Sequence, residues 1–411
     1  MTSQPTRFDP PALRRTRVPR YLLLLYLAII VVTLVVVVAS PAARGVSYAP
    51  VRELLLPPPA PIELYVLYST EKGPWLDEVV PAFERTRPTV GGRPVQLKLQ
   101  AMGSREMYLD VLNGAKQPDL ISPASSLQIS ALQDLSRAKN GAPLVRLNDS
   151  QACRSVVRTP LAFVAWRDRA DALFAKAQGK SVWPLLHQAV VDDAGWSLYG
   201  HPEWGLVKYY HTDPRSSNSG FMALLSMTYD YFNKPNSLKT GDIANPDFQK
   251  WFRAFEGVQS EFESSTGPLM DKMVAFGPSK YDIVAAYEAT AIQQFQNAAQ
   301  RSGELRVLYP PATVWSDHPF CTLNAAWVTA EKAEAARLFV DFLVSRDAQE
   351  VALTKYGFRP VDSRVALDGA QSPFVRYRDS GLQVALPPEI EVPPGDVQES
   401  LLGLWQRVTS R

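Results

Sequence analysis

The order of apolar and polar positions along the chain predicts alternating strands and helices. Residues 62–70, 94–104 and 118–126 are short apolar runs that end in small polar residues, a pattern typical of strands. Between them, residues 72–88 and 104–117 have apolar side chains at the spacing of one helix face. This order of strands and helices predicts a parallel sheet with crossover helices.

The same kind of pattern continues in the second half of the chain. Val156–Trp166 and His318–Thr329 are predicted strands, and Asp282–Ile292 is a predicted junction between a strand and a helix. Residues 331–361 have the pattern of two helices. A mixed α/β architecture therefore extends over most of the sequence.

Small hydroxylated residues follow three of the predicted strands, at Ser69–Thr70, Gly103–Ser104 and Ser122–Ser126. Ligands of parallel sheets bind beyond the carboxyl ends of the strands. These residues are therefore candidates for ligand contact, although ordinary turns favour the same residue types.

The segment His211–Gly220, "HTDPRSSNSG", directly precedes an apolar run and predicts a helix N-terminus. The first N–H groups of a helix have no partner within it. They are satisfied either by capping side chains or by an anionic or polar ligand. The segment alone leaves both interpretations open.

Tyr21–Ala39 is a run of nineteen residues without charge, and four arginines lie between positions 14 and 20. At about 1.5 Å per residue, a helix of this length matches a hydrocarbon core of roughly 30 Å. The arginines predict a cytoplasmic N-terminal side, so the remaining chain is predicted to lie outside the cytoplasm. A signal peptide cleaved after "SPA" is the alternative. The proline-rich residues 40–61 predict an extended stalk.

Charge is unevenly distributed along the 411 residues. The net charge is +2, but residues 1–44 carry +5 and the rest of the chain −3. A mildly acidic folded part argues against a nucleic-acid partner. With 46% hydrophobic and 20% charged residues, the composition is that of a globular protein with room for two or more domains.

Neither the two cysteines nor the four histidines have the spacing of metal ligands. Cys153 and Cys321 either pair in an oxidising compartment or remain buried thiols, with buried thiols slightly favoured. No nucleophile elbow, phosphate-binding loop or zinc-protease motif occurs in the sequence. No catalytic residue, metal or cofactor is predicted; the one hydrolase alternative pairs Ser126 or Ser219 with His211.

Five segments occur in an order that resembles a known family. They are "YVLYSTEKGPWLDEVVPAFE", "QPDLISPASS", "GHPEWGLVKYYHTDPRSSNSGFMALL", "AYEATAI" and the run from "HPFCTLNAAWVT" to "YGFRPV". Together, over residues 62–363, they resemble the extracellular solute-binding proteins of bacterial ABC-type uptake systems, and within them the branch associated with von Willebrand factor A-type proteins. The resemblance implies a two-lobed α/β fold of the type 2 periplasmic-binding-protein class. A hinge of crossing strands, near Val156–Trp166 and Phe320–Val328, would join the lobes.

The resemblance and the N-terminal pattern together predict the domain boundaries. They are a cytoplasmic basic tail at 1–20, a transmembrane anchor at 21–39, a proline-rich stalk at 40–61, the first part of lobe 1 at 62–155, lobe 2 at 156–318, the second part of lobe 1 at 319–363 and a C-terminal segment at 364–411.

The strand ends and the 211–220 segment supply the candidate ligand-binding residues once the two lobes face each other. They are Ser69, Thr70, Ser125, Ser126, Asp213, Ser216, Ser217, Ser219, Tyr287 and Glu288. Hydroxyl and backbone donors favour an oxyanion. Aromatic residues at Trp75, Trp204, Tyr209 and Tyr210 would favour a sugar or a cation if they lay in the cleft, but core positions are the alternative for each.

The predicted function is capture of a small polar solute by a protein tethered to the cell membrane, with the solute-binding domain in the periplasm or at the cell surface. The predicted partners are the solute, ABC permease subunits or another membrane partner, and the membrane itself. A tethered sensor or protein-interaction module is the alternative function, and a hydrolase is less favoured.

Overall fold

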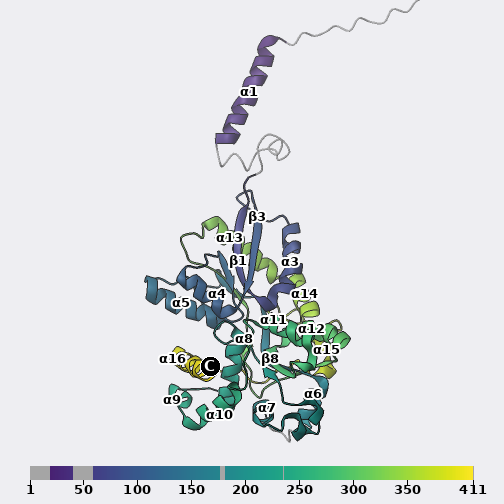
Figure 1. Ribbon diagram of the computed structural model, residues 1–411. Helices are drawn as coiled ribbons and strands as arrows, with labels where there is room; N and C mark the ends of the chain where they lie inside the picture. Colours follow the sequence, from purple (N-terminus) through teal and green to yellow (C-terminus); the bar gives the residue numbers. More distant parts are fainter. Residues whose placement is uncertain (1–18, 40–58, 176–180, 235, 411) are drawn as a thin grey trace, which may run out of the picture. The chain divides into compact units, whose positions relative to one another are not determined.

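The computed structural model describes residues 19–39, 59–175, 181–234 and 236–410 (Figure 1). Residues 1–60 and 61–411 form two separate units. In the first unit, α1 covers Arg20–Ala39, the segment predicted to be an anchor. Within the described ranges, no helix combines the length and the apolarity that crossing a membrane requires. Residues 1–18 of the predicted tail and 40–58 of the predicted stalk lie outside the described residues.

The second unit consists of two lobes, each built on a six-stranded sheet. The sheet of lobe 1 has the strand order β2-β3-β1-β4-β11-β5. Its strand β1 runs parallel to β3 and β4, whereas β11 pairs antiparallel with β4 and β5. The bounds are β1 Ile62–Ser69, β2 Thr89–Val90, β3 Arg93–Met102, β4 Leu120–Ser122, β5 Cys153–Ser155 and β11 Pro319–Thr322.

Alternate side chains of β1 are buried on opposite faces of this sheet. Leu64 and Val66 pack with α3, α13 and α14, whereas Leu67 packs with α4 and α5. A sheet covered by helices on both faces requires this alternation. The helices are α3 Gly73–Arg85, α4 Ser104–Asn113, α5 Ser126–Asn140, α13 Ala330–Leu343 and α14 Arg346–Tyr356. The predicted alternation of strands and helices is confirmed here.

The sheet of lobe 2 is centred on β6, which pairs with β8, β9, β10 and β12, while β7 pairs with β8. Phe163 on β6 faces a core that includes α7, α8, α10 and α16, and Val164 faces one that includes α11 and α12. The strand bounds are β6 Val157–Trp166, β7 Tyr209–Tyr210, β8 Ile283–Tyr287, β9 Leu305–Leu308, β10 Trp315–Ser316 and β12 Arg359–Pro360.

The remaining elements lie around lobe 2 and in the C-terminal segment. The helices are α6 Arg167–Phe174, α7 Val182–Val191, α8 Asn218–Tyr231, α9 Thr240–Ile243, α10 Pro246–Glu256, α11 Thr266–Phe276, α12 Glu288–Arg301, α15 Pro373–Arg376 and α16 Gly395–Thr409. The short 3₁₀ segments are η2 Thr70–Lys72, η3 Gly195–Tyr199, η4 Pro202–Trp204, η5 Gly277–Ser279 and η6 Arg378–Ser380.

Within the residues that the structure describes, the chain crosses between the lobes three times; the third crossing leads from α14 into β12, and the other two join strands of the two sheets directly. One runs from Ser155 at the end of β5 to Val157 in β6, and the other from Ser316 in β10 to Pro319 in β11. The second crossing holds His318 at φ 41°, in the left-handed region that a side chain with Cβ rarely adopts. Because each crossing is only one or two residues long, a change in the angle between the lobes is concentrated there.

The predicted strand at 318–329 is shorter than expected. β11 ends at Thr322, after which the N–H of Leu323 bonds to the carbonyl of Asp119 at 3.0 Å and that of Asn324 bonds to the carbonyl of Leu144 at 2.7 Å. The apolar residues after Thr322 therefore follow neighbouring loops instead of extending the β-ladder.

Cys153 and Cys321 form a disulfide between β5 and β11, with their Cα atoms 4.0 Å apart. They face each other directly in the antiparallel register. The slightly favoured prediction of two buried free thiols is therefore wrong. Strand pairing brings together two residues that are 168 positions apart, and they form a disulfide.

Candidate ligand-binding site

Four helices begin where the two lobes meet. In lobe 1, α4 starts at Ser104 after β3 and α5 starts at Ser126 after β4; in lobe 2, α8 starts at Asn218 and α11 at Thr266. The first turn of each helix has N–H groups without intrahelical partners, and the helix dipole places partial positive charge there. The interface therefore gathers backbone donors from both lobes.

Direct contacts join the two lobes around these helix ends. The N–H of Arg105 donates to the carbonyl of Ser216 at 2.8 Å, and Gln128 Nε2 donates to Asn218 Oδ1 at 2.8 Å. Gly103 permits this approach, because a Cβ at that position would lie 2.6 Å from the Ser216 carbonyl oxygen. The two lobes are thus in direct contact, and this arrangement is called closed from here on.

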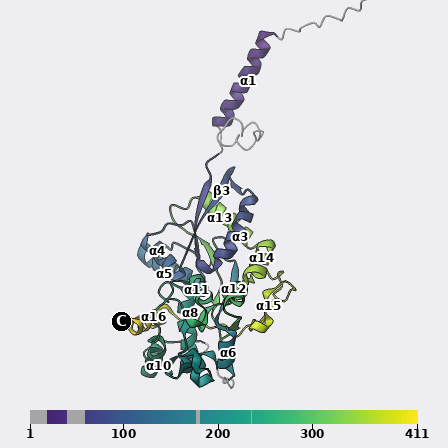
Figure 2. The same cartoon turned by 45° about the vertical axis from the view of Figure 1, so that its right-hand side comes forward.

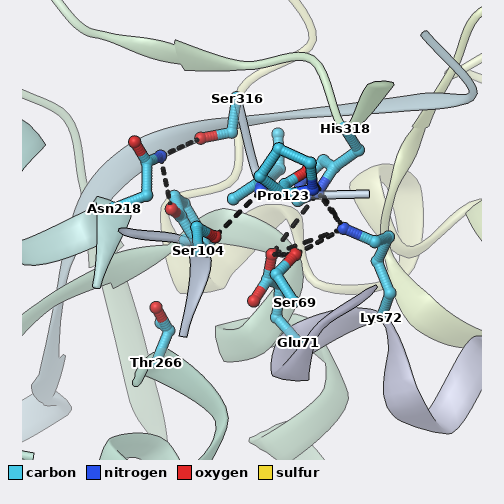
Figure 3. A network of polar contacts seen from close by, with 12 residues as sticks. Ser69, Glu71, Lys72, Ser104, Pro123, Asn218, Thr266, Ser316 and His318 are labelled. Carbon is cyan, nitrogen blue, oxygen red and sulfur yellow. Dashed lines mark hydrogen bonds and ion pairs between the residues drawn. The ribbon is translucent and has the colours of Figure 1, made fainter. Parts of the chain in front are cut away.

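A buried cluster of charged groups follows β1 at this interface. Glu71 and Lys72 have side chains only 3% and 0% exposed, and His318 from the second crossing segment is also 0% exposed. Lys72 Nζ donates to Ser69 Oγ, lies 3.2 Å from His318 Nδ1 and 3.3 Å from the Pro123 carbonyl, and is 3.9 Å from Glu71 Oε1 (Figure 3). Ser69 Oγ donates to Glu71 Oε1 at 2.5 Å.

Burial dominates the protonation of this cluster. Burial lowers the pKa of Lys72 to about 8, against the opposing charges of Glu71 and Asp317. Burial and the neighbouring Lys72 charge lower the pKa of His318 well below its usual 6.5, so its ring is neutral near neutral pH. The ammonium of Lys72 has only hydrogen-bond donors, so Nδ1 of His318 acts as the acceptor and the ring proton is on Nε2.

Lobe 2 contributes a second group of polar side chains to the interface. Ser219 Oγ lies 2.8 Å from Thr212 Oγ1 and 2.7 Å from Thr266 Oγ1. Asn218 Nδ2 donates to Tyr287 Oη at 2.7 Å and to Ser316 Oγ at 3.1 Å (Figure 3). Burial and the charge of Glu71 raise the pKa of Tyr287, which therefore stays a neutral phenol. These side chains offer hydroxyl and amide groups without a full charge.

The structure brings several of the predicted residues to this interface. Ser69 belongs to the charged cluster, and Ser219 and Tyr287 belong to the lobe 2 group. Thr70 has a buried hydroxyl with no partner, and it lies against Gly267 at the start of α11. Its unsatisfied hydroxyl is therefore positioned between the lobes.

Other predicted residues have local structural partners. Ser125 caps α5 by accepting from the N–H of Leu127, and the N–H of Ser126 donates to Asp317 at 2.7 Å. Ser217 Oγ lies 3.3 Å from Ser219 Oγ at the start of α8.

Asp213, Ser216 and Glu288 are also occupied by neighbours. Asp213 forms an ion pair with Arg215 at 2.5 Å, and Ser216 Oγ donates to the Ser264 carbonyl at 2.8 Å. Glu288 is completely buried and accepts from Arg359 at 2.7 and 2.8 Å. Its carboxylate is thus neutralised on the side of lobe 2 where β12 pairs with β6.

The sequence patterns gave no role to Lys72, His318, Asn218, Thr266 or Ser316. One signal was available for Lys72, a lone lysine in the small-residue turn after the first strand. For His318 no local signal existed, because its contact with Lys72 joins residues 246 positions apart.

The aromatic residues considered as sugar or cation contacts are mostly core residues. Trp75 is 0% exposed in the core of lobe 1, and Tyr209 is 2% exposed in the core of lobe 2. Trp204 and Tyr210 are partly buried against the lobe 2 cores. Across the described residues, no group of three or more His, Cys, Asp or Glu side chains has the arrangement of a metal site.

Two α/β lobes joined by short crossings, with helix N-termini and polar side chains facing each other between them, define the architecture of the periplasmic binding proteins. Residues 64–359 match the family model of the bacterial extracellular solute-binding proteins, and the chain belongs to this family. Members of such a family work outside the cytoplasm, in the periplasm or at the cell surface. A search of curated proteins finds no match.

Solved structures support the same fold. The sulfate-binding protein SubI from Mycobacterium tuberculosis H37Rv is 18% identical with a TM-score of 0.53, and the match covers 80% of this chain and 93% of that one. The substrate-binding protein of an ABC transporter from Agrobacterium tumefaciens is 16% identical with a TM-score of 0.54, covering 85% and 95%. A periplasmic thiamin-binding protein is 13% identical with a TM-score of 0.56, covering 87% and 100%. The fold is therefore that of the substrate-binding proteins of ABC transporters.

Proposed function

We propose that this protein captures a small oxyanion between its lobes for an ABC-type uptake system. The observation that carries the proposal is the buried ammonium group of Lys72 among four helix N-termini at the interface. A cation, backbone N–H groups and hydroxyls together suit a ligand whose oxygens are all acceptors.

Two buried donors without partners favour an acceptor ligand. The hydroxyl of Thr70 has none, and neither has Nε2 of His318, which carries the ring proton when Lys72 donates to Nδ1. Buried polar groups without partners cost free energy and are uncommon in folded proteins. An oxyanion at the interface supplies acceptors of the kind that these groups lack.

Glu71 is the one carboxylate in the charged cluster, and it is the argument for a cationic solute. Its Oε1 atom is already engaged by the Ser69 hydroxyl at 2.5 Å and lies 3.9 Å from Lys72 Nζ. Glu71 thus offsets part of the Lys72 charge, and the helix dipoles, which are positive at their N-termini, turn the balance toward an anion.

We further propose that α1 tethers the protein to the cell membrane. The support is in the sequence, which has nineteen uncharged residues at Tyr21–Ala39 after a basic flank. Alkaline carbonate extraction of membranes tests the tether. The full chain should remain with the lipid, a variant lacking residues 1–39 should be released, and release of both would contradict the proposal.

The solute is tested by thermal unfolding of the detergent-solubilised full chain with sulfate, phosphate, sugars, polyamines and metal ions. A ligand at 100 times its Kd stabilises the folded state by about 2.7 kcal/mol, which raises the midpoint measurably. The expected result is a shift with an oxyanion. A shift only with polyamines would show that Glu71, not Lys72, decides the charge of the solute.

Ser219→Ala and Ser69→Ala are the matching site variants. Each should weaken binding of the responding ion by roughly tenfold, because a hydrogen bond to a charged partner contributes about 1.5–3 kcal/mol. Ser279→Ala is the control, since Ser279 lies on the lobe 2 surface and donates only to the Phe276 carbonyl. Unchanged affinity in both site variants would refute the assignment of the ligand-binding site to this interface.

A further inference from the structure

The C-terminal segment that follows the family match at residue 359 packs as part of lobe 2. The N–H of Ile390 donates to the Thr313 carbonyl at 2.8 Å, and the N–H of Thr313 donates to the Pro388 carbonyl at 2.9 Å. Helix α16, yellow at the C-terminal end of the chain, then runs beside α9 and α10 (Figures 1 and 2). Its apolar side chains complete the lobe 2 core; they are Val397, Leu401, Leu402, Leu404 and Trp405.

Trp405 fixes the position of α16 relative to the lobe 2 part of the interface. Its Nε1 donates to Glu256 Oε2 at 2.9 Å, and the same oxygen lies 2.9 Å from His211 Nε2. His211 is followed by Thr212, whose hydroxyl contacts Ser219. Trp405 is therefore hydrogen-bonded to the buried pair of Glu256 and His211, which ties α16 to lobe 2 so that the two move as one body.

The opposite side of α16 reaches across to lobe 1. Glu399 Oε1 lies 3.2 Å from a guanidinium nitrogen of Arg105 in α4. The next residue toward the N-terminus, Gln398, lines a small cavity together with Arg105, Tyr108 and Leu127 of lobe 1. Arg105 is also the residue whose N–H bonds to the Ser216 carbonyl of lobe 2.

We propose that α16 is an interlobe clasp, in which Glu399 holds Arg105 and biases the two lobes toward the closed arrangement. The inference rests on the proposed function in that the clasp controls entry to the same interface. A helix that moves with lobe 2 and pairs with a cation on lobe 1 contributes only when the lobes are closed. The clasp therefore lowers the fraction of open protein and slows release of a captured solute.

The size of the effect follows from the exposure of the pair. Glu399 is 71% exposed and Arg105 is 20% exposed, so water and salt screen their attraction. Pairs of this kind change an equilibrium constant by about fivefold at most. Reversing the charge of Glu399 replaces the attraction by a repulsion from Arg105, which enlarges the change to roughly tenfold.

The test measures the distance between the lobes directly by pulsed electron paramagnetic resonance on the full chain. Spin labels are placed at Asp134→Cys on α5 and Lys250→Cys on α10, two exposed positions on different lobes. The native cysteines are joined in the disulfide and do not react. Glu399→Arg should increase the population at the longer distance at low salt, and adding Arg105→Glu should restore the shorter one.

Glu261→Arg is the matched control. Glu261 is 65% exposed and pairs with Lys280, and both residues belong to lobe 2. This variant should leave the distance distribution unchanged. A Glu399→Arg distribution identical to that of the parent, or an equal change in Glu261→Arg, would overturn the clasp. Glu399→Gln provides a milder variant, with a smaller expected shift, if the reversed charge impairs folding.

Because no solute is added, the outcome does not depend on the identity of the ligand. Failure of every oxyanion in the thermal panel would overturn the proposed solute and leave the distance result standing. Conversely, if an oxyanion binds and Glu399→Arg leaves the distance distribution unchanged, the proposed solute stands and the clasp is refuted.

Discussion

The buried pair of Lys72 and Glu71 should contribute little net stability to the folded protein. Burial lowers the pKa of Lys72 from 10.5 to about 8. At about 1.4 kcal/mol per pKa unit, keeping this ammonium charged in the folded protein costs on the order of 3 kcal/mol. Replacement of a buried ion pair by residues of similar volume is often neutral or stabilising.

The double variant Lys72→Met/Glu71→Gln tests this cost. It removes both charges and keeps an acceptor for the Ser69 hydroxyl, but it loses the three hydrogen bonds of Lys72, which go to Ser69, to the Pro123 carbonyl and to His318. At about 1 kcal/mol for each lost bond, these losses offset the cost that is removed, so the unfolding free energy of the double variant should lie within about 1 kcal/mol of that of the parent. It should also lose oxyanion binding, since the cation is gone.

The single variant Lys72→Met should be clearly less stable than both the parent and the double variant. It leaves the Glu71 carboxylate buried without a cation, which costs about 3–5 kcal/mol relative to the double variant. Urea unfolding followed by tryptophan fluorescence gives all three free energies near neutral pH.

A surface pair provides the control for this cycle. Lys280→Met/Glu261→Gln removes an exposed pair and should change the unfolding free energy by less than about 1 kcal/mol. A Lys72→Met/Glu71→Gln variant that is less stable than the parent by 1 kcal/mol or more would refute the reasoning, because the buried pair would then be a net source of stability.

Three further outcomes are expected. Gly103→Ala should weaken solute binding by roughly tenfold or more without destabilising lobe 1, because its Cβ would lie 2.6 Å from the Ser216 carbonyl oxygen when the lobes close. Gly241→Ala is the control, since a Cβ at that position has no atom within 4 Å. Equal affinities of the two variants for the solute would contradict closure through this contact. Burial lowers the pKa of His211, but the charge and hydrogen bond of Glu256 outweigh burial and raise it above 6.5. The stabilisation of the folded protein by the His211–Glu256 pair is therefore complete below pH 6.5 and is lost as the pH rises through the raised pKa of His211. In urea unfolding, the difference in unfolding free energy between the parent and His211→Gln should shrink with rising pH. A difference that does not change with pH would contradict the pair. Reduction of the denatured chain should add the mass of two hydrogen atoms for the disulfide, and an unchanged mass would mean free thiols.

The fold could be predicted from the sequence because local patterns of apolar and polar residues determine it. The alternation of Leu64, Val66 and Leu67 is both what the sequence displays and what the two helical layers on the sheet require. The ends of β1, β3 and β4 could be located for the same reason, and with them Ser69 and Ser104. The order of these elements also carried the family resemblance, which the family match confirms.

The chemistry of the site was less accessible because long-range pairings decide it. Glu288 and Ser69 both follow predicted strands, and nothing local distinguishes them. Arg359 pairs with Glu288 from 71 positions away, whereas Ser69 meets Lys72 within its own turn. His318 reaches the cluster only because the crossing segment that holds it passes beside Lys72. The pattern of residue types along the chain gives no information about these distances.

The disulfide between Cys153 and Cys321 has a consequence for the covalent topology of the chain. It joins the two strands of lobe 1 from which the chain leaves for lobe 2 and to which it returns, so residues 153–321 form a covalent ring. A protease that cuts one peptide bond within this ring opens it without separating the two fragments. After such a cut the protein should run as two pieces on a reducing gel and as one piece on a non-reducing gel. Outside the cytoplasm, where proteases act on exposed loops, a nicked lobe 2 would thus remain covalently attached to lobe 1.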